Sequence, residues 1–194
     1  MEFARYQDAL RERLSPLRYE HSLRVVETAL EMGRKFGLNP ERVKTAALLH
    51  DYAKDMPKEE LLEIGRREGL ISDPVEEKQP DLLHGPVGAF LCERDLGIQD
   101  EGILKAIRYH TTANVQMSML EIVIYLSDLL EPGRSYKGIK KLRQLCEKDM
   151  WAGLLRTIDE SIEYIIRSKM LLHPRTVEAR NWLLEKNKEA FYGE

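Results

Sequence analysis

The ten residues AALLHDYAKD, positions 46–55, decide how this chain is organised. Ala46 to Leu49 are typical of the last buried turns of a helix, and the apolar run changes abruptly to His50 and Asp51. Burying a carboxylate is unfavourable unless a cation or several hydrogen-bond donors compensate it. Taken alone, the pair more simply indicates a helix that ends at the surface. The weight of the pair therefore depends on the rest of the chain.

Start and stop signals of helices lie on both sides of this stretch. Ser15–Pro16 and Asn39–Pro40 each place a capping residue before a proline, which favours the first turn of a helix. Gly37 and Gly69 follow the last residues that have helical apolar spacing. We expect helices over residues 3–14, 16–36, 40–51, 58–68, 84–96, 101–110, 119–130, 138–150, 151–171 and 176–190.

The segments between these helices contain no convincing strand. Residues 70–80 are polar and contain prolines, so they predict a surface loop, and residues 131–134 predict another. Residues 122–125 alone suit a strand, but they lie among helical signals. The sequence therefore predicts an all-α helical bundle without an internal repeat.

Composition narrows the classes of function. With 194 residues the chain is long enough for one domain over residues 1–194, and a net charge of −3 argues against a nucleic-acid partner. The two cysteines, Cys92 and Cys146, form no metal-binding or disulfide motif, which favours the reducing cytoplasm. No apolar run approaches the roughly 18 residues of a membrane span, so we expect no membrane partner.

The placement of the histidines is more informative than their number. His21 lies in the middle of an expected helix, His84 at the start of one, and His110 at the end of another. Asp128 interrupts the apolar run 122–130, where a carboxylate is hard to explain as part of a solvated face. Any one of these residues alone is more simply an ordinary core or surface residue, but together they indicate a site.

These residues, on successive helices of an all-α chain, resemble the HD superfamily of metal-dependent phosphohydrolases. Residues 48–54, LLHDYAK, resemble the end of its signature helix. From about Leu17 to Trp182 the chain resembles one bacterial branch of this superfamily, the YqeK family. The motifs that carry this closer resemblance are His84–Gly85–Pro86, Tyr109–His110–Thr111, Ser127–Asp128 and Glu131–Pro132–Gly133–Arg134.

The resemblance implies a fold and an activity. It implies an HD-type helical bundle with a metal-site core over about residues 17–135 and C-terminal helices over residues 138–190 packed on it. The implied reaction is hydrolysis of diadenosine tetraphosphate at its central bridge, by attack of a metal-activated water, to give two ADP. Two alternatives stay open: an HD-type phosphohydrolase for another nucleotide (a nucleoside mono- or triphosphate or a cyclic dinucleotide), and a non-catalytic nucleotide-binding module.

Two imidazoles and two carboxylates form a mixed nitrogen and oxygen ligand set. The expected metal ligands are His21, His50, Asp51 and Asp128, which suit a first-row divalent ion that keeps open positions. Manganese, nickel and zinc fit this ligand set, and the resemblance points to iron. Such an ion makes hydroxide available near neutral pH, and Asp51 beside the water site is a candidate proton acceptor.

The remaining histidines and three cations are candidates for binding phosphate. His84 and His110 either complete a second metal site with Asp51 as a bridge or bind phosphates; we favour phosphates, because no further carboxylate is evident. Lys54 lies four residues after His50, and we expect it on the same helical face, neutralising phosphate charge during catalysis. The other candidates for substrate binding are Arg18, Tyr109 and Arg134, the last on a loop that is able to close over a phosphate chain.

The junction before the last expected helix is the final candidate. Thr176 has the position of an N-cap. In the YqeK family this junction lies near the nucleotide, so the resemblance implies substrate contacts for Leu172, His173, Pro174, Arg175 and Thr176. We expect a small-molecule nucleotide as the partner, and a homodimer stays open.

Overall fold

The computed structural model describes residues 2–186, and within them the chain is helical and contains no strand. The predicted all-α class is confirmed. No helix in this part of the chain combines the length and apolarity needed to cross a membrane. The helices are α1 (Glu2–Arg13), α2 (Pro16–Lys35), α3 (Pro40–Leu49), α4 (Lys58–Arg67), α5 (Pro74–Lys78), the 3-10 helix η1 (Pro80–Leu83), α6 (His84–Leu96), α7 (Glu101–Tyr109), α8 (Met119–Leu130), α9 (Ile139–Lys148), α10 (Met150–Arg167) and α11 (Pro174–Lys186).

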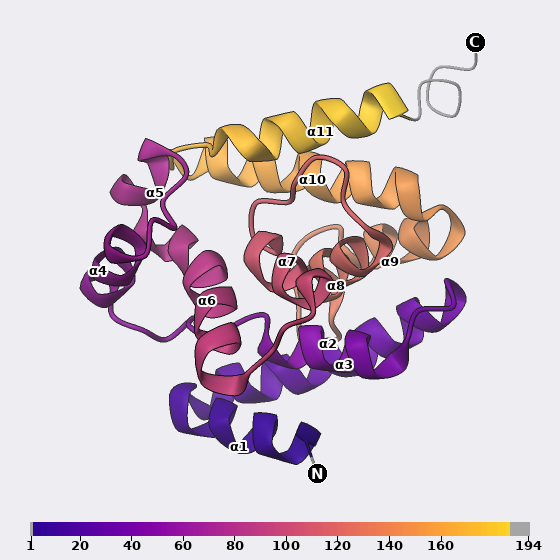
Figure 1. Ribbon diagram of the computed structural model, residues 1–194. Coiled ribbons are helices and arrows are strands. Elements are labelled where there is room, and N and C mark those ends of the chain that lie inside the picture. The colour runs from indigo at the N-terminus through magenta and orange to yellow at the C-terminus, as the bar shows by residue number, and fades with distance from the viewer. Residues whose placement is uncertain (1, 187–194) are drawn as a thin grey trace.

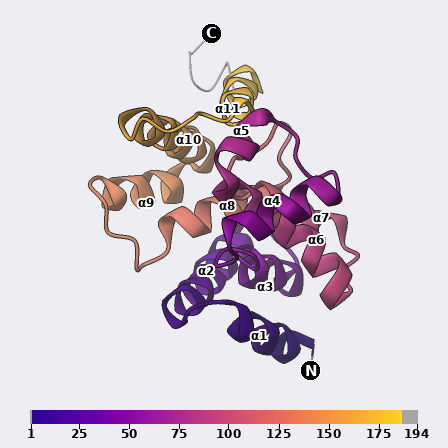
Figure 2. The ribbon, with the colours of Figure 1, turned by 90° about the vertical axis from the view of Figure 1, so that its left-hand side faces the viewer.

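The helices are arranged in tiers (Figure 1). Helices α1, α2 and α3 lie together at one end, α6, α7 and α8 lie in the middle, and α10 and α11 cover the opposite end. The turned view shows the same order, with α9 beside α8 and α10 (Figure 2). Helix α8 packs against α2, α3 and α7 on one side and against α9 and α10 on the other.

Two clusters of buried apolar side chains meet at α8. Leu120, Val123 and Ile124 belong to the cluster formed with the N-terminal helices, whereas Tyr125 and Leu126 belong to the cluster formed with α9, α10 and α11. A helix that is buried on opposite faces must be apolar almost all round. This explains why residues 122–125 look like a strand in sequence, and it leaves Asp128 inside the molecule.

Several start signals work as the sequence predicts. The side chain of Asn39 accepts hydrogen bonds from the backbone N–H groups of the first turn of α3, and Ser118 forms a capping box with Glu121 at α8. Ser15 differs, because its side chain makes no capping hydrogen bond. Its backbone N–H instead donates to Asp55, 2.8 Å away, and so fixes the turn after α3 to the start of α2.

Residues 70–80 are not a simple loop, and this prediction is wrong. Asp73 caps the short helix α5 through a capping box with Glu76, with Pro74 in the first turn, and η1 follows from Pro80. The aspartate, proline and glutamate are together a start signal, but α5 has only 5 residues and shows no apolar periodicity.

The C-terminal helix boundaries also differ from the predicted ones. Asp149 caps α10, and the helix ends at Arg167, four residues before the predicted position 171. Lys169, with a φ of 55°, prevents the helix from continuing. The last helix begins at Pro174, so Thr176 lies inside its first turn and is not the N-cap. The imidazole of His173 accepts the N–H of Arg175 instead. Residues 187–190 of this predicted helix lie outside the described residues.

Candidate metal centre

Four predicted ligands from three parts of the chain meet at one point. His21 lies on α2, His50 and Asp51 directly follow α3, and Asp128 lies on α8. The Nε2 atom of His21 lies 2.9 Å from Asp128 Oδ1 and 3.9 Å from Asp51 Oδ2. The Nε2 atom of His50 lies 3.4 Å from Asp51 Oδ2 and 3.8 Å from Asp128 Oδ1. The ligand atoms of His21, His50 and Asp51 all lie within 4.8 Å of one another, and so do those of His50, His110 and Asp128.

The hydrogen bonds of the two imidazoles leave lone pairs aimed at that point. The Nδ1 atom of His50 donates to the carbonyl of Ala47 at 2.7 Å, and Nδ1 of His21 donates to the Glu131 carboxylate at 3.1 Å. Both Nε2 atoms are buried and have no hydrogen-bond partner of good geometry; Asp128 Oδ1 lies 2.9 Å from that of His21, a contact between two acceptors unless a cation or a proton lies between them. A buried polar atom without a partner is unusual, and a metal ion satisfies an imidazole whose other nitrogen donates to protein.

A second group of ligands shares Asp51. His84 Nε2 and His110 Nε2 lie 3.4 and 3.5 Å from Asp51 Oδ1, whereas the first group faces Oδ2. Each ring donates Nδ1–H to a backbone carbonyl, that of Asp81 or Ile107. The two Nε2 atoms are 3.0 Å apart, so two lone pairs face one another unless a cation or a proton lies between them.

Close packing of two helices makes this pair possible. A side chain at Gly85 of α6 would place its Cβ 2.6 Å from the carbonyl oxygen of Arg108 on α7. Glycine therefore allows α6 and α7 to approach until His84 and His110 reach the same point. This is the physical reason for a glycine directly after His84.

The electrostatics of the cluster favour ionised carboxylates. Burial alone raises the pKa of Asp51, but His50, His110 and His84 together hold it well below its usual value. The pKa of Asp128 is also lowered, since His21 and His50 outweigh the effect of burial. Burial lowers the pKa of His84 to about 4, so this imidazole is neutral at pH 7, whereas Asp51 and Asp128 outweigh burial and raise the pKa of His50. Because metal binding requires ionised carboxylates and neutral imidazoles, an ion at this point would displace any proton on His50 Nε2.

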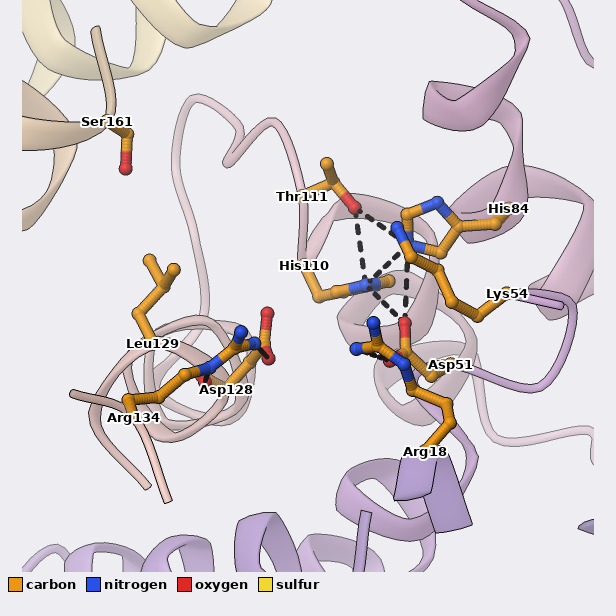
Figure 3. Close-up of a pocket in the computed structure, with 10 residues that line it drawn as sticks. All are labelled: Arg18, Asp51, Lys54, His84, His110, Thr111, Asp128, Leu129, Arg134 and Ser161. Carbon is orange, nitrogen blue, oxygen red and sulfur yellow. Dashed lines mark hydrogen bonds and ion pairs between the residues drawn. The ribbon is translucent and has the colours of Figure 1, made fainter. Parts of the chain in front are cut away.

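The cluster opens into a cavity of about 190 Å³ (Figure 3). Arg18 Nη1 lies 3.0 Å from Asp51 Oδ2, and Arg134 Nη2 lies 2.5 Å from Asp128 Oδ1. Lys54 lines the cavity and has no ion pair with any described carboxylate. The lining residues are Arg18, Asp51, Lys54, His84, His110, Thr111, Asp128, Leu129, Arg134 and Ser161.

Two of the cations differ from the sequence expectation. Helix α3 ends at Leu49, so Lys54 reaches the cavity from the following turn and not from a shared helical face with His50. Arg134 is already bonded to Asp128, through Nη2 to the carboxylate and through Nε to the backbone carbonyl at 2.9 Å. Arg134 therefore already lies at the site, and its loop does not need to close to bring it there.

The junction 172–176 lies behind His110, and none of its five residues lines the cavity. Buried His173 contacts the Glu76 carboxylate at 3.3 Å, while Arg175 lies over the ring of Tyr109, 5.0 Å from its centroid. Because Tyr109 precedes His110, these residues form a layer that supports the second group of ligands.

Sequence reasoning assigned no role to three residues that the structure places in or beside the centre. The Thr111 hydroxyl lies 3.2 Å from both His84 Nε2 and His110 Nε2. Ser161 lines the cavity from α10, and Glu131 contacts His21. Thr111 and Glu131 lie in motifs that carry the family resemblance, whereas nothing in the sequence around Ser161 marks it.

The model of the HD domain matches residues 18–133, which include every ligand in both groups. This chain belongs to the HD domain family. The HD domain is followed here by α9, α10 and α11, and α10 contributes Ser161 to its cavity. The candidate ligands, although far apart in the sequence, therefore all lie within the part of the chain that matches the HD domain.

Similar proteins extend over nearly the whole chain. The symmetrical bis(5'-nucleosyl)-tetraphosphatase of Bacillus subtilis is 38% identical over 90% of this chain and 94% of its own length. The protein of the same name from Halalkalibacterium halodurans is 34% identical over 90% of this chain and 93% of its own length. A crystal structure of a predicted HD superfamily hydrolase involved in NAD metabolism, from Clostridium acetobutylicum, matches with a TM-score of 0.91 and 38% identity, covering 95% of this chain and 97% of that one.

Proposed function

We propose that this enzyme hydrolyses diadenosine tetraphosphate at its central bridge and releases two ADP. The observation that carries the proposal is a buried cluster of four imidazoles and two carboxylates that opens into a cavity lined by three cations. The names of the relatives that match 90% of this chain, symmetrical bis(5'-nucleosyl)-tetraphosphatases, support the substrate and the position of cleavage.

The donor set fits two divalent ions better than one. His21, His50, Asp51 and Asp128 would hold the first ion, and Asp51, His84 and His110 would hold the second. Of the two roles open to His84 and His110, their opposed lone pairs 3.0 Å apart favour metal binding over direct phosphate contact. When bound, such ions supply a water of lowered pKa and polarise a phosphoryl oxygen.

The chain's own residues would bind and orient the phosphates. Lys54 is the unpaired cation at the cavity, and Arg18 and Arg134 contribute N–H donors that Asp51 and Asp128 do not fully use. Charge-assisted hydrogen bonds from these groups stabilise the charge that develops on the transferred phosphoryl group and on the ADP that leaves. Asp51, which would also hold the metal, stays the predicted proton acceptor for a metal-activated water.

Three cations reach the cavity from different parts of the chain: Arg18 from α2, Lys54 from the turn after α3 and Arg134 from the segment after α8 (Figure 3). Positive charge distributed in this way suits a ligand with several phosphates. The names of the relatives support the position of cleavage.

The proposal also includes the native metal, the cellular location, the domain organisation and the oligomeric state. We infer iron as the native metal from the family, with manganese, nickel and zinc compatible with the ligands. The absence of a disulfide or metal motif around Cys92 and Cys146 supports a cytoplasmic location. A single domain with a core over residues 17–135, and a homodimer, stay predictions.

Product analysis tests the proposal directly. Protein supplied with Mn²⁺ or Fe²⁺ is incubated with diadenosine tetraphosphate, nucleoside mono- and triphosphates, a cyclic dinucleotide and NAD, and the products are resolved by chromatography. We expect ADP as the sole product from diadenosine tetraphosphate and no turnover by Asp51→Asn. AMP together with ATP would contradict symmetrical cleavage, and exclusive turnover of another nucleotide would overturn the proposed substrate. Binding without any turnover would favour a nucleotide-binding module.

A further inference from the structure

The imidazoles of the centre are oriented in two different ways. Three of them lie just after a helix or at its first residue, and each donates Nδ1–H to the backbone carbonyl three residues earlier. These pairs are His50–Ala47, His84–Asp81 and His110–Ile107. For these three histidines the local backbone alone fixes which ring nitrogen faces the ligands.

His21 has no such local partner. It lies in the middle of α2, where the helix uses the backbone carbonyls of the preceding turn. Its Nδ1 instead meets Glu131 Oε1 at 3.1 Å, from a residue 110 positions away in the chain. Glu131 is buried to 2% exposure and accepts two further hydrogen bonds on Oε2, from Arg24 Nε at 2.6 Å and from the Gly133 N–H at 2.6 Å.

We infer that Glu131 is a positioning residue that sets the tautomer of His21, so that Nε2 presents a lone pair to the first metal. Arg24 and Gly133 hold the carboxylate in place for this role. The inference rests on the metal centre of the proposed function, and it assigns to the Glu131–Arg24 pair a task that the other three imidazoles leave to the backbone.

Replacing Glu131 by glutamine tests the inference, because an amide presents both a donor and an acceptor at this position. In Glu131→Gln, the Arg24 and Gly133 N–H donors attract the amide oxygen, which turns the amide NH₂ toward His21 Nδ1. A nitrogen that faces a donor must act as an acceptor, so the proton of the neutral ring moves to Nε2. The isosteric variant therefore points an N–H at the metal position. Glu131→Ala removes the carboxylate without imposing the wrong tautomer.

The first measurement is the tautomer of His21 in metal-free protein. Two-bond ¹H–¹⁵N spectra at pH 8 distinguish a protonated Nδ1 from a protonated Nε2, and single His→Gln variants assign the five histidines. In metal-free protein Asp128 Oδ1, 2.9 Å from His21 Nε2, is a second acceptor, so the decisive readout is the proton on Nδ1. We expect Nδ1 of His21 to carry a proton in the wild type and to carry none in Glu131→Gln. A proton that stays on Nδ1 in Glu131→Gln would overturn the inference, and so would a wild-type ring without a proton on Nδ1.

The second measurement is Mn²⁺ affinity, read from the free-ion EPR signal. Loss of a hydrogen-bond partner behind a metal ligand costs about 10–100-fold in affinity. We expect the full loss in Glu131→Gln and a smaller one in Glu131→Ala, an order opposite to that expected from cavity formation alone. Glu131→Ala also tests the inference if Glu131→Gln fails to fold, because unchanged affinity in it would contradict the inference.

The matched control is Glu121→Gln. Glu121 is also buried and lies in the first turn of α8, where its Oε2 atom accepts the Ser118 N–H at 2.9 Å, whereas Glu131 directly follows that helix. Glutamine is accepted in a capping box, so tautomer and affinity should match the wild type. Failure of the wild type to bind Mn²⁺ would count against the proposed function, whereas equal binding by the wild type and Glu131→Gln would overturn this inference alone.

Discussion

Asp51 is the residue through which the two groups of ligands are coupled. Its Oδ2 atom faces His50 and the Arg18 guanidinium, and its Oδ1 atom faces His84 and His110. A carboxylate with 2% exposure among so many donors has no structural task that an apolar residue could not perform better. The proposed role of Asp51, a ligand shared by two ions, explains its position.

Replacing Asp51 by asparagine should therefore empty both metal positions. We expect Asp51→Asn to lose at least about 100-fold in metal affinity, more than a supporting residue costs, and to have no measurable turnover. Metal content by mass spectrometry after gel filtration checks this. Asp55→Asn, which changes a nearby aspartate bonded to Ser15, is the control with normal metal content. Two bound ions in Asp51→Asn would refute the bridging role.

Lys54 should act on the substrate and not on the metal. A hydrogen bond to a charged group contributes about 1.5–3 kcal/mol, so Lys54→Met should lower kcat/KM about 10–100-fold with unchanged metal content. Steady-state kinetics with diadenosine tetraphosphate measure this effect. Lys58→Met, at an exposed residue that pairs with Asp81, should be neutral. An equal loss in both variants would show that Lys54 does not contact the phosphates.

The sequence picks out the residues of the cluster at this scale but not how they pair. His50, Asp51 and Asp128 stand out because each is a polar residue in an apolar stretch. The approach of His84 to His110 depends on Gly85 packing against α7, and the task of Glu131 depends on a contact with a distant helix. Such tertiary contacts have no local signature in the sequence.

At the scale of elements, α5 fastens the C-terminal helices to the rest of the molecule. Glu76, buried to 1% exposure, accepts the Ser72 N–H at 2.6 Å and contacts His173 at 3.3 Å. Gln79 adds two hydrogen bonds to the backbone of Leu171, its Nε2 donating at 3.2 Å and its Oε1 accepting at 2.5 Å. These contacts between α5 and the C-terminal segment cannot be read from the sequence, in which residues 70–80 suit an exposed loop.

Glu76→Gln should destabilise the fold in a pH-dependent way. Burial raises the pKa of Glu76, but hydrogen bonds from His173 and Ser72 outweigh it and hold the pKa below 4.5. A lowered pKa in the folded state means stability that is present above pH 4.5 and lost as the pH falls through the folded pKa. At pH 7 we expect a loss of about 1–3 kcal/mol in the free energy of unfolding.

Urea denaturation of the wild type and Glu76→Gln checks this prediction at pH 7 and below pH 4.5. The difference between the two proteins should shrink at the lower pH. Glu77→Gln, at an exposed neighbour paired with Arg66, should differ little from the wild type at either pH. If Glu76→Gln lowered the free energy of unfolding equally at both pH values, the charge of Glu76 would not be what stabilises these contacts.

At the scale of the whole molecule, the centre brings together five segments of the chain. Its ligands come from α2, the turn after α3, α6, the end of α7, and α8, and α8 also belongs to both apolar clusters. An ion that binds only the folded arrangement stabilises it by mass action, by about 2.7 kcal/mol at 100 times the Kd.

Metal should therefore raise the melting temperature. For a chain of this size about 2–4 °C corresponds to 1 kcal/mol, so saturating Mn²⁺ should raise Tm by about 5–11 °C over protein with chelator. Differential scanning calorimetry measures the shift. Asp51→Asn should show little of it, and an equal shift in that variant would place the stabilising ion elsewhere.

The all-α class follows from caps, prolines and apolar spacing spread over the whole chain, and it depends little on any one boundary. The convergence of five separate segments on one cavity is a property of packing, and the family resemblance stands in for it in the sequence analysis. Ser161 shows the limit of the sequence analysis, because it lines the cavity from α10, a helix outside the residues that match the HD domain.

Products formed as metal is titrated test the account most directly. Protein freed of metal by chelation receives from zero to two equivalents of Mn²⁺, and diadenosine tetraphosphate hydrolysis is followed by chromatography. The account predicts no turnover without metal, ADP as the sole product, and a rate that rises up to two equivalents. ADP formation by metal-free protein, or AMP and ATP at any metal level, would contradict it.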